Sequence, residues 1–185
     1  IHTLLIGYFQ SYRYVEDEDD LNVIKRMFDK IKLKRELTSI IQNWEYRIIV
    51  HVRLQDYLEH PHFGILDSEY YQRALLQITQ IRHFKEIWII SDDFELAKDR
   101  LSGIPFLRRE EFQVTWLDTE SLNSVETLQL MRNASGYVLS NSTFGWWAAL
   151  LSNDSSPEVV VPSPWFVAMP DPDNMHPSNW IRLHR

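Results

Sequence analysis

The stretch YRIIVHVRLQDY, residues 46–57, gives the first indication of the fold. Its first part is a β-branched run that ends at Val52, which is typical of a buried strand. Alternate residues of a strand share a face, so His51 and Arg53 point one way while Val50 and Val52 point the other. The stretch therefore predicts a buried strand that delivers a histidine and an arginine to one side of its carboxyl end.

Strands and helices alternate after this stretch. We predict further strands at 86–90, 112–116, 136–139 and 159–161, and helices at 21–33, 68–80, 94–101, 125–132 and 144–151, followed by a proline-rich tail. This alternation predicts βαβ units, hence an α/β, Rossmann-like parallel sheet with helices on both faces. In such sheets ligands bind beyond the carboxyl ends of the strands. A length of 185 residues suits one α/β domain, covering residues 1–185.

Composition limits the classes of function and partner. The net charge of −7 argues against nucleic acid, which requires a basic stripe. The absence of cysteine excludes thiolate nucleophiles, zinc–thiolate sites and disulfides, and fits a reducing compartment. No run of about 18 apolar residues occurs, so we expect no transmembrane segment in this chain. The chain begins at Ile1 and shows no signal peptide, which predicts a segment cut from a longer protein.

Two interpretations of Arg53 follow from the residues alone. An arginine at a strand end, beside His51, can bind a diphosphate through two parallel hydrogen bonds. It could equally form a surface salt bridge with Asp56, three residues along.

Adjacent aspartates, Asp92 and Asp93, follow the strand predicted at 86–90. They could suggest a metal site, but no Asp-x-Asp motif is present at this position. Asp92 with Glu95 three residues later instead fits a helix capping box, in which Asp replaces the usual Ser or Thr. We therefore expect capping here rather than metal binding.

The stretch YVLSNSTFGWWAAL, residues 137–150, runs from a strand through small hydroxyl and amide side chains into an apolar helix. Free N–H groups at a helix start, together with such hydroxyls, make an anion site. Capping alone would require only one of these polar residues. The pattern favours a ligand loop formed by Asn141, Ser142 and Thr143.

Together these motifs resemble those of the α-1,2-fucosyltransferase family, glycosyltransferase family 11. The family's His-x-Arg-Arg-Gly-Asp-Tyr motif is matched by residues 51–57, and its Ser-Asp-Asp motif by residues 91–93. Its Asn-Ser-Ser/Thr-Phe-Ser-Trp-Trp motif is matched by residues 141–147. Weaker matches occur at residues 7–11, 69–71, 162–166 and 179–181, so the motifs span nearly the whole chain in the family's order.

The resemblance implies the donor-binding half of a two-domain GT-B glycosyltransferase, because the family's N-terminal glycine-rich motif and acceptor domain are missing. It implies transfer of L-fucose from GDP-β-L-fucose to a galactose hydroxyl of a glycan, with inversion and without a metal or other cofactor. Arg53 would neutralise the departing β-phosphate. Asp56 would orient Arg53 or act as the base, a role that the missing half could equally supply. The donor would be bound by His51, Arg53, Asp92, Asn141, Ser142 and Thr143.

The chain departs from the family at Leu54 and Gln55, where the family has its second arginine and a glycine. If that glycine has a positive φ, Gln55 would tolerate the backbone poorly. The alternative function is therefore an inactive homologue that keeps the fold and nucleotide binding without transfer. An unrelated doubly wound nucleotide binder is disfavoured, because no Gly-x-Gly-x-x-Gly motif or P-loop is present.

We expect a bacterial enzyme that makes surface polysaccharide in the cytoplasm, or as a peripheral protein on the cytoplasmic side of the membrane. The acidic composition and the absence of cysteine and of a transmembrane segment favour this location. The Golgi lumen is the alternative, if a eukaryotic anchor has been lost.

Overall fold

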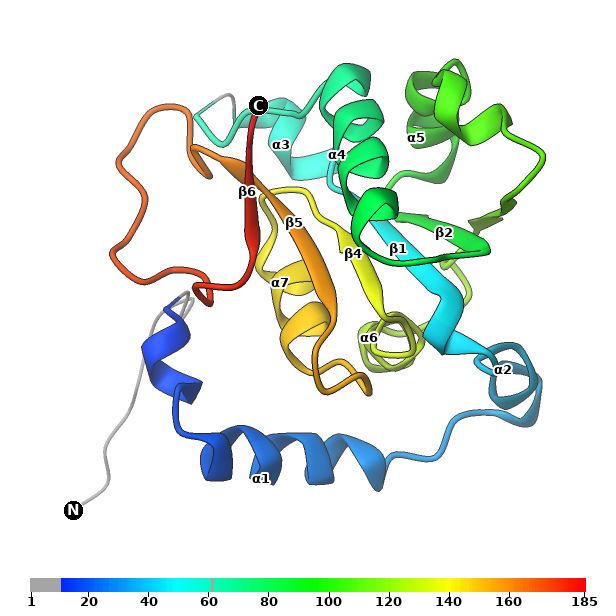
Figure 1. The fold of residues 1–185 in the computed structure, drawn as a ribbon, viewed down its shortest axis with the longest axis vertical. Coiled ribbons are helices and arrows are strands. Elements are labelled where there is room, and N and C mark those ends of the chain that lie inside the picture. The colour runs from blue at the N-terminus through cyan, green and yellow to red at the C-terminus, as the bar shows by residue number, and fades with distance from the viewer. Residues whose placement is uncertain (1–10, 61) are drawn as a thin grey trace.

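A computed structural model describes residues 11–60 and 62–185, and the strands in these ranges form one six-stranded sheet. The strands lie in the order β3-β2-β1-β4-β5-β6, and every neighbouring pair is parallel (Figure 1). Their bounds are β1 (Arg47–Val52), β2 (Glu86–Ser91), β3 (Gln113–Leu117), β4 (Gly136–Val138), β5 (Glu158–Ser163) and β6 (Ile181–His184). The predicted Rossmann-like α/β class is confirmed.

Helices cover both faces of the sheet. Figure 1 shows α4 (Ser68–Ile81) and α5 (Phe94–Leu101) on one side, and α6 (Ser124–Met131) and α7 (Thr143–Leu150) on the other. In β1 the side chains of Val50 and Val52 join the hydrophobic cluster of α4 and α5, whereas Ile49 joins that of α7. This alternation confirms that adjacent residues of β1 serve opposite faces, and it explains why the whole strand is buried.

Side-chain caps mark the starts of several helices. Helix α1 (Glu18–Asp29) begins within an acidic run at residues 16–20, where the Asp17 carboxylate accepts from the Asp19 amide. Of the two residues that could cap α4, Asp67 and Ser68, it is Asp67 that does so, and its carboxylate accepts from the Tyr70 amide at 2.8 Å. Carboxylates at these positions also favour the positive end of the helix dipole.

Short elements complete the fold. They are the helices α2 (Arg35–Ile40) and α3 (Gln55–Glu59) and the 3-10 turns η1 (Tyr12–Val15), η2 (Trp44–Tyr46) and η3 (Pro105–Arg108). No helix within the described ranges has the length and apolarity that a membrane span requires.

The sequence did not predict β6, which lies in the proline-rich tail. Its four residues pair in parallel with β5, so the sheet extends one strand further than expected. Ile181 and Leu183 pack against the cluster of α4, while the alternating Arg182 and His184 are exposed. The weak motif match at residues 7–11 falls outside the described residues, apart from Ser11.

Candidate functional site

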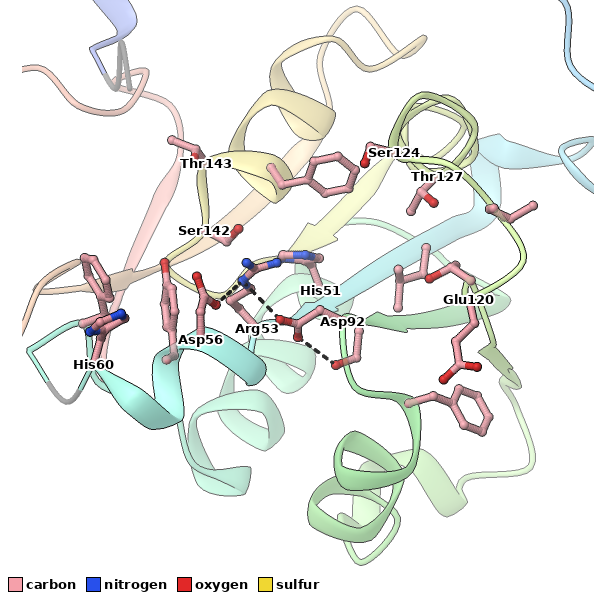
Figure 2. A pocket seen from close by; sticks show the side chains of 18 of the residues that line it. His51, Arg53, Asp56, His60, Asp92, Glu120, Ser124, Thr127, Ser142 and Thr143 are labelled. Atoms are coloured by element: carbon pink, nitrogen blue, oxygen red, sulfur yellow. Dashed lines mark hydrogen bonds and ion pairs between the residues drawn. The ribbon is translucent and has the colours of Figure 1, made fainter. Parts of the chain in front are cut away.

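A cavity of about 1090 Å³ opens at the carboxyl ends of the central strands. Its middle is lined by His51 and Arg53 from the end of β1, by Asp92 after β2, and by Ser142 and Thr143 at the start of α7 (Figure 2). The strand order reverses between β1 and β4, so the cavity lies at the topological switch point of the sheet. Three separate sequence motifs therefore converge on one cavity.

Arg53 lies between two carboxylates in this cavity (Figure 2). Its Nε lies 2.9 Å from Asp56 Oδ1 and 3.2 Å from Asp92 Oδ2, so the expected Arg53–Asp56 salt bridge is present. Burial lowers the pKa of Arg53, but the hydrogen bond to Asp56 and the charge of Asp92 outweigh it and raise the pKa. Within the described residues both contacts use Nε, and the two terminal nitrogens make no hydrogen bond. The guanidinium is thus oriented while its outer edge stays available to an anion.

The expected capping role of Asp92 is wrong. Helix α5 is capped by Asp93, whose carboxylate accepts from the Leu96 amide at 3.0 Å. Asp92 instead accepts from the amides of Leu54 and Gln55, at 2.8 and 3.2 Å. Because it also pairs with Arg53, Asp92 holds the β1–α3 turn and the arginine in one arrangement.

Leu54 and Gln55 are accommodated without the strain anticipated for a position that needs glycine. Gln55 opens α3, and the non-glycine residues with positive φ in the described ranges are Asn43 and Asn174. Leu54 is fully buried in the core beside α4. The two departures from the family motif therefore leave the loop that carries Arg53 well packed.

His51 is buried, with 3% of its surface exposed, and its Nδ1 lies 3.0 Å from Ser140 Oγ. Burial, together with the nearby charge of Arg53, lowers the pKa of His51 to about 3, so its ring is neutral near pH 7. A Cβ on Gly145 would lie 2.7 Å from His51 Nδ1. The glycine therefore allows α7 to approach β1 closely.

The start of α7 faces the cavity. Ser142 is the N-cap, but its side chain caps none of the helix amides. The first amides of a helix have no partner within the helix, so they remain available to a ligand.

Asn141, which we expected to contact a donor, is not among the residues that line the cavity. Its side-chain Nδ2 donates to the Phe63 carbonyl at 2.7 Å, and its own carbonyl accepts from Tyr57 Oη at 2.6 Å. Asn141 is 1% exposed, so it joins two loops from behind the site.

Both ends of the cavity are formed by residues that the sequence analysis missed. One end follows β3 and is lined by Phe94, Asp118, Thr119, Glu120, Leu122, Ser124 and Thr127. The rule that ligands bind beyond strand ends would have located this end, had it been applied to the strand predicted at 112–116. The other end is lined by Tyr57, His60, His62, Phe63, Phe166, Met169 and Pro172. None of the seven tryptophans lines the cavity.

A parallel sheet in this strand order, with a cavity at its switch point, defines a Rossmann-type α/β fold. The chain belongs to Glycosyl transferase family 11, whose sequence profile matches residues 3–183. The family resemblance found in the motifs is thereby confirmed, and the chain is a glycosyltransferase-family protein.

Two relatives from Escherichia coli are similar over 97% of this chain. One is an alpha-1,2-colitosyltransferase, 27% identical over 197 residues, and the other is the O-antigen biosynthesis glycosyltransferase WbnK, 25% identical over 191 residues. The alignments cover 62% and 60% of these relatives, so the chain spans less than two thirds of their length.

Two crystal structures of POFUT1 in complex with GDP are similar at low sequence identity. The TM-scores are 0.43 and 0.45, with identities of 13% and 12%. The similarity covers 73% and 76% of this chain and 47% and 50% of the POFUT1 chains.

Proposed function

We propose that this chain is the donor-binding part of a GT-B fucosyltransferase that moves L-fucose from GDP-β-L-fucose to a galactose hydroxyl of a glycan. Transfer would proceed with inversion and without a metal. One observation carries this proposal: the free edge of Arg53 and the uncapped start of α7 line the same cavity. A guanidinium edge and helix amides together suit a diphosphate.

The polar groups of the cavity suggest how the nucleotide lies. The diphosphate would bind between Arg53, Ser142 and Thr143 in the middle of the cavity. The end beyond β3 carries the carboxylates of Asp118 and Glu120. Guanine presents two adjacent N–H donor groups to a carboxylate, so its edge fits this end by hydrogen bonding.

In the proposed reaction Arg53 stabilises the negative charge that grows on the departing β-phosphate, an interaction that strengthens in the transition state. His51 is neutral and supports the loop at the start of α7. The hydrogen bond from Arg53 lowers the pKa of Asp56, which makes this carboxylate a weak base. We therefore assign Asp56 to orienting Arg53.

An alternative donor sugar and the expected bacterial location each have support from the relatives. Colitose is the alternative sugar, because one of the relatives is an alpha-1,2-colitosyltransferase. Because both relatives come from Escherichia coli and one acts in O-antigen biosynthesis, we propose a role in bacterial surface polysaccharide synthesis on the cytoplasmic side.

Calorimetric titration of GDP in the presence of a chelator tests the proposed donor site. We expect Arg53→Ala to weaken GDP binding by about 2 kcal/mol, the scale of a lost charge-assisted hydrogen bond. Arg109→Ala is the matched control, because Arg109 is exposed and lies outside this cavity. Absence of GDP binding to the folded, unaltered chain would contradict the proposed function.

Transfer itself distinguishes an enzyme from an inactive homologue. A full-length version of the protein, including an acceptor-binding half, would be incubated with GDP-fucose or GDP-colitose and a galactose-terminated oligosaccharide, and the product identified by mass spectrometry. Product from one donor identifies the sugar. GDP binding without product from either donor would support the inactive homologue.

A further inference from the structure

Aromatic side chains from three segments line the cavity beside Arg53. We call Tyr57, His60, His62, Phe63 and Phe166 the aromatic rim. Phe63 is its centre: its ring stacks on Tyr57 at 4.8 Å with an interplanar angle of 25°, and lies 4.3 Å from the ring of His62. Phe166 lies 6.2 Å from Phe63. The rim therefore forms a continuous wall rather than a set of isolated rings.

Polar contacts behind the rim hold its central part in place. The Phe63 carbonyl accepts from Asn141 Nδ2 at 2.7 Å and from Arg185 Nη1 at 3.1 Å. Arg185 also donates to the Gly64 carbonyl at 2.7 Å. Gly64 has a φ of +69°, and a Cβ there would lie 2.3 Å from Val167, so only glycine suits this tight passage.

The segment that carries Phe166 is fixed as well. The Asp171 carboxylate accepts from the amides of Trp165 and Phe166, at 2.9 and 3.0 Å. The amide of Val167 donates to the His62 carbonyl at 3.2 Å, which joins this segment to the loop of Phe63. Because the segments of Phe63 and Phe166 are both fixed by hydrogen bonds, the rim is preorganised. Binding of a ligand therefore costs little free energy for ordering these side chains.

The position of the rim indicates which part of a ligand it meets. The Arg53 guanidinium carbon lies 5.9 Å from the centre of the Tyr57 ring, so the rim begins where the proposed diphosphate site ends. Glu120, which with Asp118 suits the base, lies with Ser124 and Thr127 at the other end of the cavity (Figure 2). The group attached to the far side of the diphosphate is therefore the one that reaches the rim.

The chemistry of the rim matches a sugar ring. The faces of aromatic rings carry negative partial charge, and the C–H groups on one face of a pyranose carry positive partial charge. The imidazoles of His60 and His62 add hydrogen-bonding groups, which suit the hydroxyls around such a ring. Aromatic walls with a few polar groups are typical of small-molecule sites.

We propose that the aromatic rim is a pyranose-binding subsite, on which the transferred sugar or the acceptor sugar packs against the cluster of rings centred on Phe63. This inference rests on the proposed function, because it uses the diphosphate position to orient the ligand. The central residue of the rim, Phe63, lies outside the family motifs, as do His60 and His62.

Titration of two pairs of ligands into Phe63→Ala tests the subsite. If the rim holds the donor sugar, the variant binds GDP-fucose about fivefold more weakly while its affinity for GDP stays within about twofold of the unaltered chain. If the rim holds the acceptor, the loss appears with methyl β-galactoside, titrated in the presence of GDP. Phe94→Ala, at the opposite end of the cavity, is the matched control and should weaken GDP and GDP-fucose equally.

His62→Ala provides a second variant, because His62 is exposed and its loss leaves the core intact. An equal loss of GDP and GDP-fucose affinity in Phe63→Ala would place the base on the rim and overturn the inference. Unchanged binding of all ligands in both folded variants would overturn it as well. Failure of the unaltered chain to bind GDP would instead overturn the proposed function, and the inference with it.

Discussion

At the scale of single residues, the site depends on the close approach of α7 to β1 at Gly145. The neighbouring ring of His51 is buried, neutral and paired with Ser140, so it has little freedom to move aside. The motif match predicted that residues 141–147 belong to a site, but the family motif has serine where this chain has Gly145 and so gave no reason for a glycine there. The reason is a contact between residues 94 positions apart, which no local pattern contains.

We predict that Gly145→Ala displaces His51, because the added Cβ would lie 2.7 Å from its Nδ1. The free energy of unfolding should fall by about 1–3 kcal/mol, the usual cost of overpacking, even though alanine favours helix. Urea unfolding and GDP titration would measure the two effects. Gly103→Ala is the control, because a Cβ at Gly103 meets no atom within 4 Å. Equal stability of both variants would contradict this account.

At the scale of elements, the helix predicted at 94–101 is confirmed as α5, but its cap is displaced by one residue. Local spacing allowed either Asp92 or Asp93 to be the cap. The choice depends on the amides of Leu54 and Gln55, which lie 38 and 37 residues away in the sequence. Both donate hydrogen bonds to the Asp92 carboxylate, so it is not free to cap α5. The cap therefore falls to Asp93.

Substitutions at Asp92 and Asp93 should have different effects, one on GDP binding and the other on stability. We predict that Asp93→Ala lowers the free energy of unfolding by about 1 kcal/mol through the lost cap and leaves GDP binding unchanged. Asp92→Asn should weaken GDP binding, because its amide nitrogen cannot accept the hydrogen bonds that hold Arg53 and the β1–α3 turn. Thermal unfolding and calorimetry would record both. If Asp92→Asn lowered stability and Asp93→Ala weakened GDP binding instead, Asp92 would be the cap.

At the scale of the whole molecule, two hydrophobic clusters enclose the sheet, and the cluster on the α7 side also surrounds a second histidine. His176 Nδ1 lies 3.2 Å from Trp146 Nε1, and burial followed by the charge of Arg182 lowers the pKa of His176 to about 4. The pKa of His51 is likewise lowered, to about 3, so both histidines stay neutral in the folded chain down to about pH 5. In the unfolded chain both have pKa values near 6.5, so unfolding is favoured by acid.

We predict that the free energy of unfolding falls by about 2 kcal/mol per histidine between pH 7.5 and pH 5. The sign follows because the unfolded chain binds protons below about pH 6.5 that the folded chain excludes. Urea unfolding at the two pH values measures the change. His176→Asn keeps an acceptor near Trp146 and should remove about half of the loss. If His176→Asn left the loss of stability between pH 7.5 and pH 5 unchanged, His176 would not be one of its sources.

The sequence alone determined the parallel α/β class, the two-faced packing of β1 and the delivery of His51 and Arg53 to one strand end. These features follow from periodicity and motif order, which are local properties of the chain. The tertiary structure alone decided the pairing of β6, the partners of Asp92, the place of Asn141 behind the site and the two ends of the cavity. Each depends on contacts between distant segments, such as Asn141 with Phe63, 78 residues apart, and a local pattern carries no record of them.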